Sequence, residues 1–159
     1  MEKIETYGEN YFGQWRDTRT ACRGIVLRGG DILLSHETAN GQYMIPGGGL
    51  EDGESLAACC QREVAEETGV LVDPGEPVLE IDEYYEDVRY VSFYFFCTPV
   101  GTTGPRLTER EKAVGMEPRW VSVEQAIEAF SHHAEYAATD EMRRGLYLRE
   151  YTALCCLLK

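Results

Sequence analysis

The segment from Gly48 to Val70, GGLEDGESLAACCQREVAEETGV, constrains this chain more than any other stretch. It opens with glycines, and between Glu54 and Thr68 it contains neither Pro nor Gly. Most of the residues in that interval are good helix formers. We therefore expect a helix of about four turns over 54–68, ended by Gly69 in the way that glycine commonly ends helices.

Glutamates crowd one side of this expected helix. Glu63 and Glu67 are four residues apart and Glu66 lies beside them, so the three carboxylates project from one side within one turn. Left alone, these charges repel one another. A divalent cation removes the repulsion, and Mg²⁺ takes oxygen ligands while keeping waters that a phosphate-bearing substrate can displace. The positively charged guanidinium group of Arg62 can hold a carboxylate in place through paired hydrogen bonds.

A glycine-rich loop, Ile45-Pro46-Gly47-Gly48-Gly49, leads into the acidic segment. Backbone without side chains can approach a metal ion or a phosphate closely, and a carbonyl of this loop can be a further oxygen ligand. Taken singly, a glycine triplet is usually a turn and a glutamate-rich helix is usually a solvated face. The two features together favour a functional site.

The spacing of the segment resembles the Nudix box without a departure. The fixed positions of that box are filled by Gly48, Glu54, Arg62, Glu63, Val64, Glu66, Glu67, Gly69 and Val70. The resemblance covers roughly residues 20–130. It implies an α/β protein with the Nudix fold, an α/β/α sandwich with a mixed β-sheet.

The resemblance also implies roles for the box residues. A metal ion, Mg²⁺ or Mn²⁺, is held in the family by a loop carbonyl and by box glutamates. Those ligands map to Gly47, Glu63, Glu66 and Glu67. The catalytic set implied in this sequence consists of Glu54, Arg62, Glu63, Glu66 and Glu67. In that set, Glu54 and Arg62 shape and support the site.

Nudix enzymes often add a glutamate from beyond the box, as a base or a metal ligand. Here a polar segment at 108–111, which we expect to be a loop, offers Glu109 and Glu111. An exposed charged loop without a role is an equally good interpretation. Further candidates for stacking on a base or holding a phosphate are Trp15, Tyr43, Tyr84, Tyr85, Arg23 and Arg89, although most aromatic residues at such positions belong to the core.

The activity implied by the resemblance is metal-dependent cleavage of the diphosphate linkage in a nucleoside diphosphate joined to another group. The residues do not select the substrate within that class. Two alternatives stay open. One is a Nudix-like module that binds a nucleotide without cleaving it, and the other is a pyrophosphatase for a non-nucleotide substrate such as a prenyl or inositol diphosphate.

Composition limits the partners and the compartment. The formal net charge of −13 argues against a nucleic-acid polymer as partner, because such binding rests on a basic face, whereas a small phosphorylated substrate can be bridged by metal. The six cysteines have no CxxC spacing, so we expect reduced thiols in a cytoplasmic protein. No apolar run approaches the 18 residues of a membrane span, so we expect no membrane partner.

The length of 159 residues suits one domain, with an N-terminal extension over 1–19 and a C-terminal helix over 136–159. Within that helix we expect an interruption at Gly145. The apolar run at 151–158 would suit either a homodimer surface or packing on the protein's own core. Other expected strands lie at 20–27, 32–36, 43–45, 70–72, 78–85, 88–99 and 119–121, and Ser122 is expected to begin a further helix.

Overall fold

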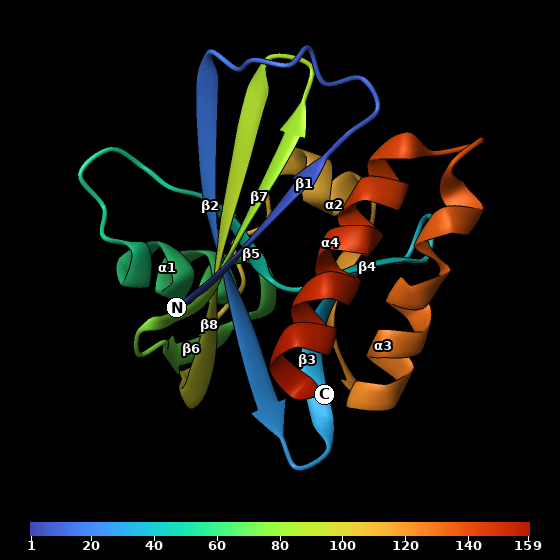
Figure 1. The fold of residues 1–159 in the computed structure, drawn as a ribbon. Helices are drawn as coiled ribbons and strands as arrows, with labels where there is room; N and C mark the ends of the chain where they lie inside the picture. Colours follow the sequence, from blue (N-terminus) through green and yellow to red (C-terminus); the bar gives the residue numbers. More distant parts are fainter.

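The computed structural model describes residues 1–159 and contains nine strands, which pair in both parallel and antiparallel orientations. The strands are β1 Glu2–Tyr7, β2 Asp17–Arg28, β3 Asp31–Glu37, β4 Gln42–Met44, β5 Gly47–Gly49, β6 Val70–Asp73, β7 Pro77–Tyr85, β8 Val88–Thr102 and β9 Met116–Ser122. The helices are α1 Leu56–Thr68, α2 Glu109–Ala113, α3 Val123–Ser131, the 3₁₀ helix His132–Tyr136 and α4 Glu141–Leu158. Helix α1 lies on one side of the central strands, while α3 and α4 lie on the other (Figure 1).

The strand order β1-β7-β8-β2-β3-β4 contains two parallel pairs, β1 with β7 and β2 with β8. Strand β2 pairs with β8 along most of its length but with β3 only at Leu27–Ile32 and Arg28–Asp31. Farther back along β2, the short strand β5 takes the edge that β3 leaves free, pairing at Ala21–Arg23. This split brings the glycine loop against the middle of β2.

Two apolar clusters form the core, one on each face of the sheet. The first lies under α1 and includes Cys60, Val64 and Phe95. The second lies under α3 and α4 and includes Ile81, Phe130 and Leu154, with side chains of the 151–158 run packed against it. The two helical layers around a mixed sheet confirm the expected α/β sandwich.

Several sequence-based expectations need correction. Segment 108–111 is not an open loop, because Thr108 caps α2 in a capping box with Glu111. Helix α4 continues through Gly145, whose bare backbone packs against the Tyr85 hydroxyl, where an added Cβ would lie 2.9 Å away. Segment 1–19, expected to be an N-terminal extension, contains strand β1. The C-terminal helix expected over 136–159 begins only at Glu141.

The expected start of the helix after Ser122 and the expected turns are confirmed. Ser122 caps α3 in a capping box, and the β2–β3 and β7–β8 turns fall at the expected places. All six cysteines are free thiols. No helix is long and apolar enough to cross a membrane.

Candidate active site

Helix α1 carries the box glutamates, and its ends are defined by local chemistry. The Ser55 side chain accepts a hydrogen bond from the Ala58 amide, so the helix begins at Leu56 rather than at Glu54. At the other end Gly69 adopts φ 73°, a left-handed conformation that glycine reaches without steric cost. The expected C-terminal stop is therefore confirmed, and Glu54 lies in the loop ahead of the helix.

The glycine loop approaches α1 closely. A Cβ placed on Gly48 would fall on the Glu63 carboxyl group, and one placed on Gly47 would fall on backbone of β2. Any side chain at either position would force the loop away from the helix. The two glycines therefore keep backbone carbonyls and amides beside the glutamates.

Arg62 organises the exposed part of the site. Its guanidinium binds Glu54 through two hydrogen bonds, from Nε at 2.8 Å and Nη2 at 3.0 Å, and also donates to Glu63 at 2.8 Å. A further bond runs from Nη2 to the Gly49 carbonyl at 2.9 Å. The Arg62 hydrogen bonds hold the pKa of Glu54 at about 2, well below its usual range. This network supports the assignment of Glu54 and Arg62 to shaping the loop.

Glu67 is the buried carboxylate of the site, with a relative exposure of 4%. Its Oε2 accepts hydrogen bonds from the Ser35 hydroxyl at 2.9 Å and from the Gly47 amide at 3.3 Å, but no cationic side chain pairs with it. Burial raises the pKa of Glu67 to about 8, the two hydrogen bonds oppose the rise, and the charges of Glu111 and Glu63 add to it. The buried Glu67 carboxyl group therefore has no positive charge beside it to stabilise its ionised form.

Glu63 and Glu66 line the same side of α1 but turn toward Arg62. Burial raises the pKa of Glu63 despite its bond to Arg62, and Glu66 lies 3.3 Å from an Arg62 nitrogen. No three His, Cys, Asp or Glu side chains converge on a single metal position. The oxygen-rich donor set, with Glu67 buried and uncompensated, nevertheless fits a hard cation that draws these carboxylates together.

The two distal glutamates lie in different surroundings. The Glu109 side chain is 94% exposed and pairs with Lys112 at 3.4 Å. Glu111 lies near enough to the box for its charge to raise the pKa of both Glu63 and Glu67. The structure therefore brings Glu111, and not Glu109, toward the expected site, even though Glu111 Oε1 also accepts the capping bond from the Thr108 amide at 2.8 Å.

Sequence reasoning missed two polar residues that fix this region. Ser35, on β3, holds the Glu67 carboxylate. Glu150, fully buried on α4, accepts a 2.6 Å hydrogen bond from the Ile45 amide, two residues before Gly47. A signal for Glu150 was available, because Tyr147, Glu150 and Leu154 share one helical face and that face is otherwise apolar.

The remaining candidates divide between core, surface and a cavity. Tyr84 is buried and stacks on Tyr7, and Trp15 is half exposed beneath the Arg89 guanidinium. His132 has a surface position beside Glu128. Tyr85 and Tyr43 line cavities, and Arg23 packs against Gly47.

Comparison with known proteins agrees with this geometry. The sequence profile of the NUDIX domain matches residues 18–141. A solved NUDIX hydrolase from Nitrosomonas europaea superposes with a TM-score of 0.57 at 22% identity, covering 85% of this chain and 88% of that one, which shows a shared fold. The chain therefore belongs to the Nudix family.

Two curated human relatives are similar over part of their length. The diphosphoinositol polyphosphate phosphohydrolase NUDT4B is 32% identical over 111 residues, which cover 66% of this chain and 59% of the relative. The 8-oxo-dGDP phosphatase NUDT18 is 34% identical over 74 residues, covering 45% of this chain and 22% of the relative. The chain thus spans less than two thirds of either protein, and the two names describe different substrates.

Proposed function

We propose that this chain, as a single domain over residues 1–159, is a metal-dependent pyrophosphohydrolase that cleaves the diphosphate linkage of a nucleoside diphosphate joined to a second group. The observation that carries the proposal is Glu67, a buried carboxylate without a cationic partner, facing a glycine loop and neighbouring acidic groups. Such an arrangement costs stability unless a cation binds there. The family relationship supplies the reaction class.

We assign the metal ligands to the Gly47 carbonyl and to Glu63, Glu66 and Glu67. When bound, Mg²⁺ or Mn²⁺ neutralises diphosphate oxygens and lowers the pKa of a coordinated water. Arg62 holds Glu63 and, together with Glu54, fixes the loop. These contacts orient the acidic groups before the substrate arrives, which reduces the reorganisation required during reaction.

Proton removal from the attacking water falls to a carboxylate of this cluster. Glu66 is the box glutamate with the greatest freedom, since its contact to Arg62 is 3.3 Å and its side chain is 35% exposed. Glu111 is the second candidate, because it faces the box from α2. General base catalysis by a positioned carboxylate contributes about 10²- to 10⁴-fold to a rate.

The substrate class is supported by the relatives and by charge. Both human relatives are named for hydrolysis of a phosphorylated compound, one of them a nucleoside diphosphate. An acidic chain with a net charge of −13 attracts such an anion only where cations gather, so the metal is needed for binding as well as for chemistry. We infer activity on a small nucleotide derivative.

The experiment that tests this function is a substrate panel. Purified protein would be incubated with nucleoside triphosphates, nucleotide sugars, ADP-ribose and diphosphoinositol polyphosphates, each with Mg²⁺, with Mn²⁺ or with chelator, and phosphate-containing products would be quantified. We expect one nucleoside diphosphate derivative to be hydrolysed far faster than the rest, only with metal. Tight nucleotide binding without products would support the non-catalytic module, and selective hydrolysis of the inositol compound would support the non-nucleotide alternative.

A further inference from the structure

Strand β1 forms one edge of the sheet, and its outer side is unpaired. The strand order ends at β1, and β7 is the strand that pairs with it. In Figure 1, β1 crosses in front of the other strands. An edge strand presents backbone N–H and C=O groups that can form a ladder with a further strand. The edge of β1 is therefore able to accept one.

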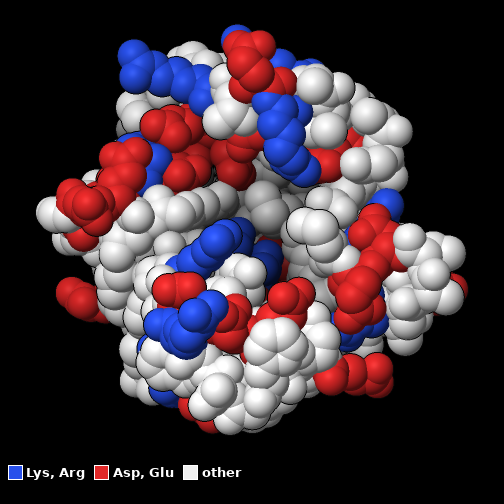
Figure 2. Space-filling model, turned by 90° about the horizontal axis from the view of Figure 1, so that it is seen from above, with Lys and Arg blue, Asp and Glu red and all other residues white.

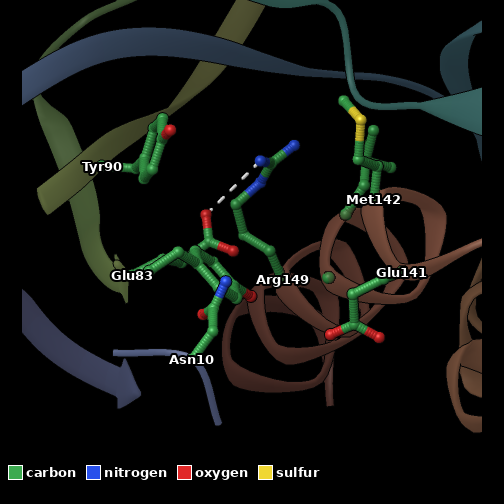
Figure 3. Close-up of a pocket in the computed structure, with 9 residues that line it drawn as sticks. Asn10, Glu83, Tyr90, Glu141, Met142 and Arg149 are labelled. Atoms are coloured by element: carbon green, nitrogen blue, oxygen red, sulfur yellow. Dashed lines mark hydrogen bonds and ion pairs between the residues drawn. The ribbon is translucent and has the colours of Figure 1, made fainter. Parts of the chain in front are cut away.

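This edge is separate from the cavity of about 400 Å³ between the β7–β8 hairpin and α4. Figure 3 shows Glu83 and Arg149 meeting in that cavity. Its lining includes Asn10, which follows β1 in the chain, but no residue of the strand itself. A strand added beside β1 would therefore leave the cavity open.

The side chains of β1 alternate between the two faces of the sheet. Ile4 packs against the apolar cluster under α3 and α4, so Lys3 and Glu5 lie on the opposite face. Their side chains are 43% and 41% exposed, and the Lys3 ammonium lies 3.6 Å from the Glu5 carboxylate and 3.3 Å from that of Asp82. The edge thus presents one cation and one anion, two residues apart on one face.

That spacing is self-complementary in an antiparallel pair. With a two-fold axis at Ile4, Lys3 of each copy lies opposite Glu5 of its partner. The exposed Met1 and Tyr7 lie opposite each other in the same register. An axis at Lys3 or at Glu5 would instead place like charges face to face, as would parallel pairing in register. The charges of β1 therefore favour one way of pairing with a second copy.

The end of α4 borders the same edge. The Cys156 thiol donates a 3.1 Å hydrogen bond to the Glu2 carboxylate, and residues 155–158 are partly exposed. In the antiparallel arrangement the two copies of α4 lie on one face of the joined sheet. Stable interfaces bury about 1,200–2,000 Å² in total, and the helix ends add to the area that the paired strands supply.

The net charge limits where two copies can meet. Each copy carries −13, so contact is unfavourable wherever acidic groups predominate on both sides. At the hairpin end, basic side chains stand among acidic ones rather than in a separate basic patch that could receive an acidic face (Figure 2). On β1, by contrast, Lys3 and Glu5 balance each other across the two-fold axis.

We propose that β1 is the interaction surface for a second copy of this chain, through antiparallel β1–β1 pairing in the register that places Lys3 opposite Glu5. The two sheets then form one continuous sheet across the two-fold axis. This contact does not depend on the proposed function, because no residue of the box takes part in it.

Sedimentation of the purified protein from about 1 µM to about 1 mM tests this pairing. We expect the mass to rise from 18.0 kDa toward twice that value. Lys3→Glu and Glu5→Lys should each raise the dissociation constant about tenfold or more, because symmetry turns two attractive pairs into two repulsive ones. The double variant Lys3→Glu/Glu5→Lys should return it to within about threefold of wild type. Lys112→Glu, the same charge reversal on α2, should leave it unchanged.

A cross-link tests the register without changing Lys3, which also binds Asp82. In the proposed register the two copies of residue 4 have Cβ atoms about 4.5–5.5 Å apart. Oxidation by oxygen with a copper catalyst should therefore join Ile4→Cys chains into a disulfide-linked dimer. Thr6→Cys, which would lie opposite Glu2, should not cross-link, and wild type controls for the native thiols.

Three results would overturn the inference. The first is a mass of 18.0 kDa for wild type at every concentration. The second is a dimer that the folded single variants leave unchanged, or that the double variant fails to restore. The third is cross-linking of Thr6→Cys as readily as of Ile4→Cys. Circular dichroism would verify folding, and if Lys3→Glu unfolds, Glu5→Lys and the cross-link decide the question.

Discussion

Two buried glutamates, Glu67 and Glu150, face the glycine loop from opposite helices. Glu150 accepts hydrogen bonds from the Ile45 amide, from the Tyr94 hydroxyl at 2.6 Å and from the Arg149 guanidinium at 3.1 Å. Glu67 has only the neutral donors of Ser35 and the loop amide. Both carboxylates are buried, but only one has a cation beside it.

We interpret this difference as that between a carboxylate with a structural role, Glu150, and one proposed to bind a metal ion, Glu67. A buried charge with a cation and a full set of donors is part of the scaffold, and its removal leaves the partner uncompensated. A buried carboxylate without a cation is stable only when protonated or when an ion from outside binds. In this chain Glu150 holds the loop through the Ile45 amide, and we propose that Glu67 binds a metal ion.

The largest expected effect is the loss of turnover in Glu67→Gln, which tests the contrast between Glu67 and Glu150. The amide preserves shape but cannot carry the negative charge that a cation needs. We expect turnover of the substrate found in the panel to fall by about 10²- to 10⁴-fold, because a bound metal ion contributes several kcal/mol to stabilising the transition state. We also expect the melting temperature of metal-free protein to stay the same or rise, because glutamine does not need to take up a proton on folding as the buried Glu67 carboxyl does. Steady-state kinetics and thermal unfolding measure the two effects.

A matched control is Glu109→Gln, which makes the same chemical change on an exposed residue. Its rate should remain within about twofold of wild type, the ordinary scatter for a surface change far from the reacting groups. Retention of wild-type activity by Glu67→Gln would remove this residue from the mechanism.

Replacement of Glu150 should lower the melting temperature, unlike replacement of Glu67. Glu150→Ala leaves the Arg149 guanidinium buried beside Tyr94 without its nearest carboxylate. Breaking a buried pair in this way costs about 3–5 kcal/mol, which lowers the melting temperature of a chain of this size by about 10 °C. Thermal unfolding with and without metal measures the loss. A melting temperature equal to that of wild type would show that Glu150 is not the support of the loop.

The contrast between the two glutamates also marks how far sequence reasoning reaches. The box, its helix and the Gly69 stop follow from local spacing and propensity, so they were predictable, as was the sandwich that the resemblance implied. The pairing of β1 with β7 was not, because it joins distant segments and leaves no local signal. Likewise, Ser35 reaches Glu67 only through the tertiary fold. In the sequence Glu109 and Glu111 are equivalent candidates, and only the orientation of α2 in the fold distinguishes them.

A pH series sharpens the comparison further. The folded-state pKa of Glu67 is about 8, above the usual value of 4.5, so the folded protein retains a proton that the unfolded chain releases between those values. The stabilisation from that proton is complete below pH 4.5 and is lost as pH rises through about 8. We therefore expect metal-free wild type to lose stability relative to Glu67→Gln between about pH 5 and 9, as measured by thermal unfolding at each pH. A constant difference would refute the assignment.

The smallest expected effect separates Glu111 from Glu109. Glu111 raises the pKa of Glu67 through its charge, whereas Glu109 projects into solvent. Because Glu111 also caps α2, Glu111→Gln is the suitable change: glutamine keeps an oxygen for the Thr108 amide and removes only the charge. We expect about a tenfold lower rate at saturating substrate, or weaker activation by Mg²⁺ by a similar factor, the range seen when groups supporting a metal site are altered. Kinetics across a Mg²⁺ titration distinguish the two. If Glu111→Gln and Glu109→Gln behave alike, α2 contributes only structure, and the base must be a glutamate of the box itself.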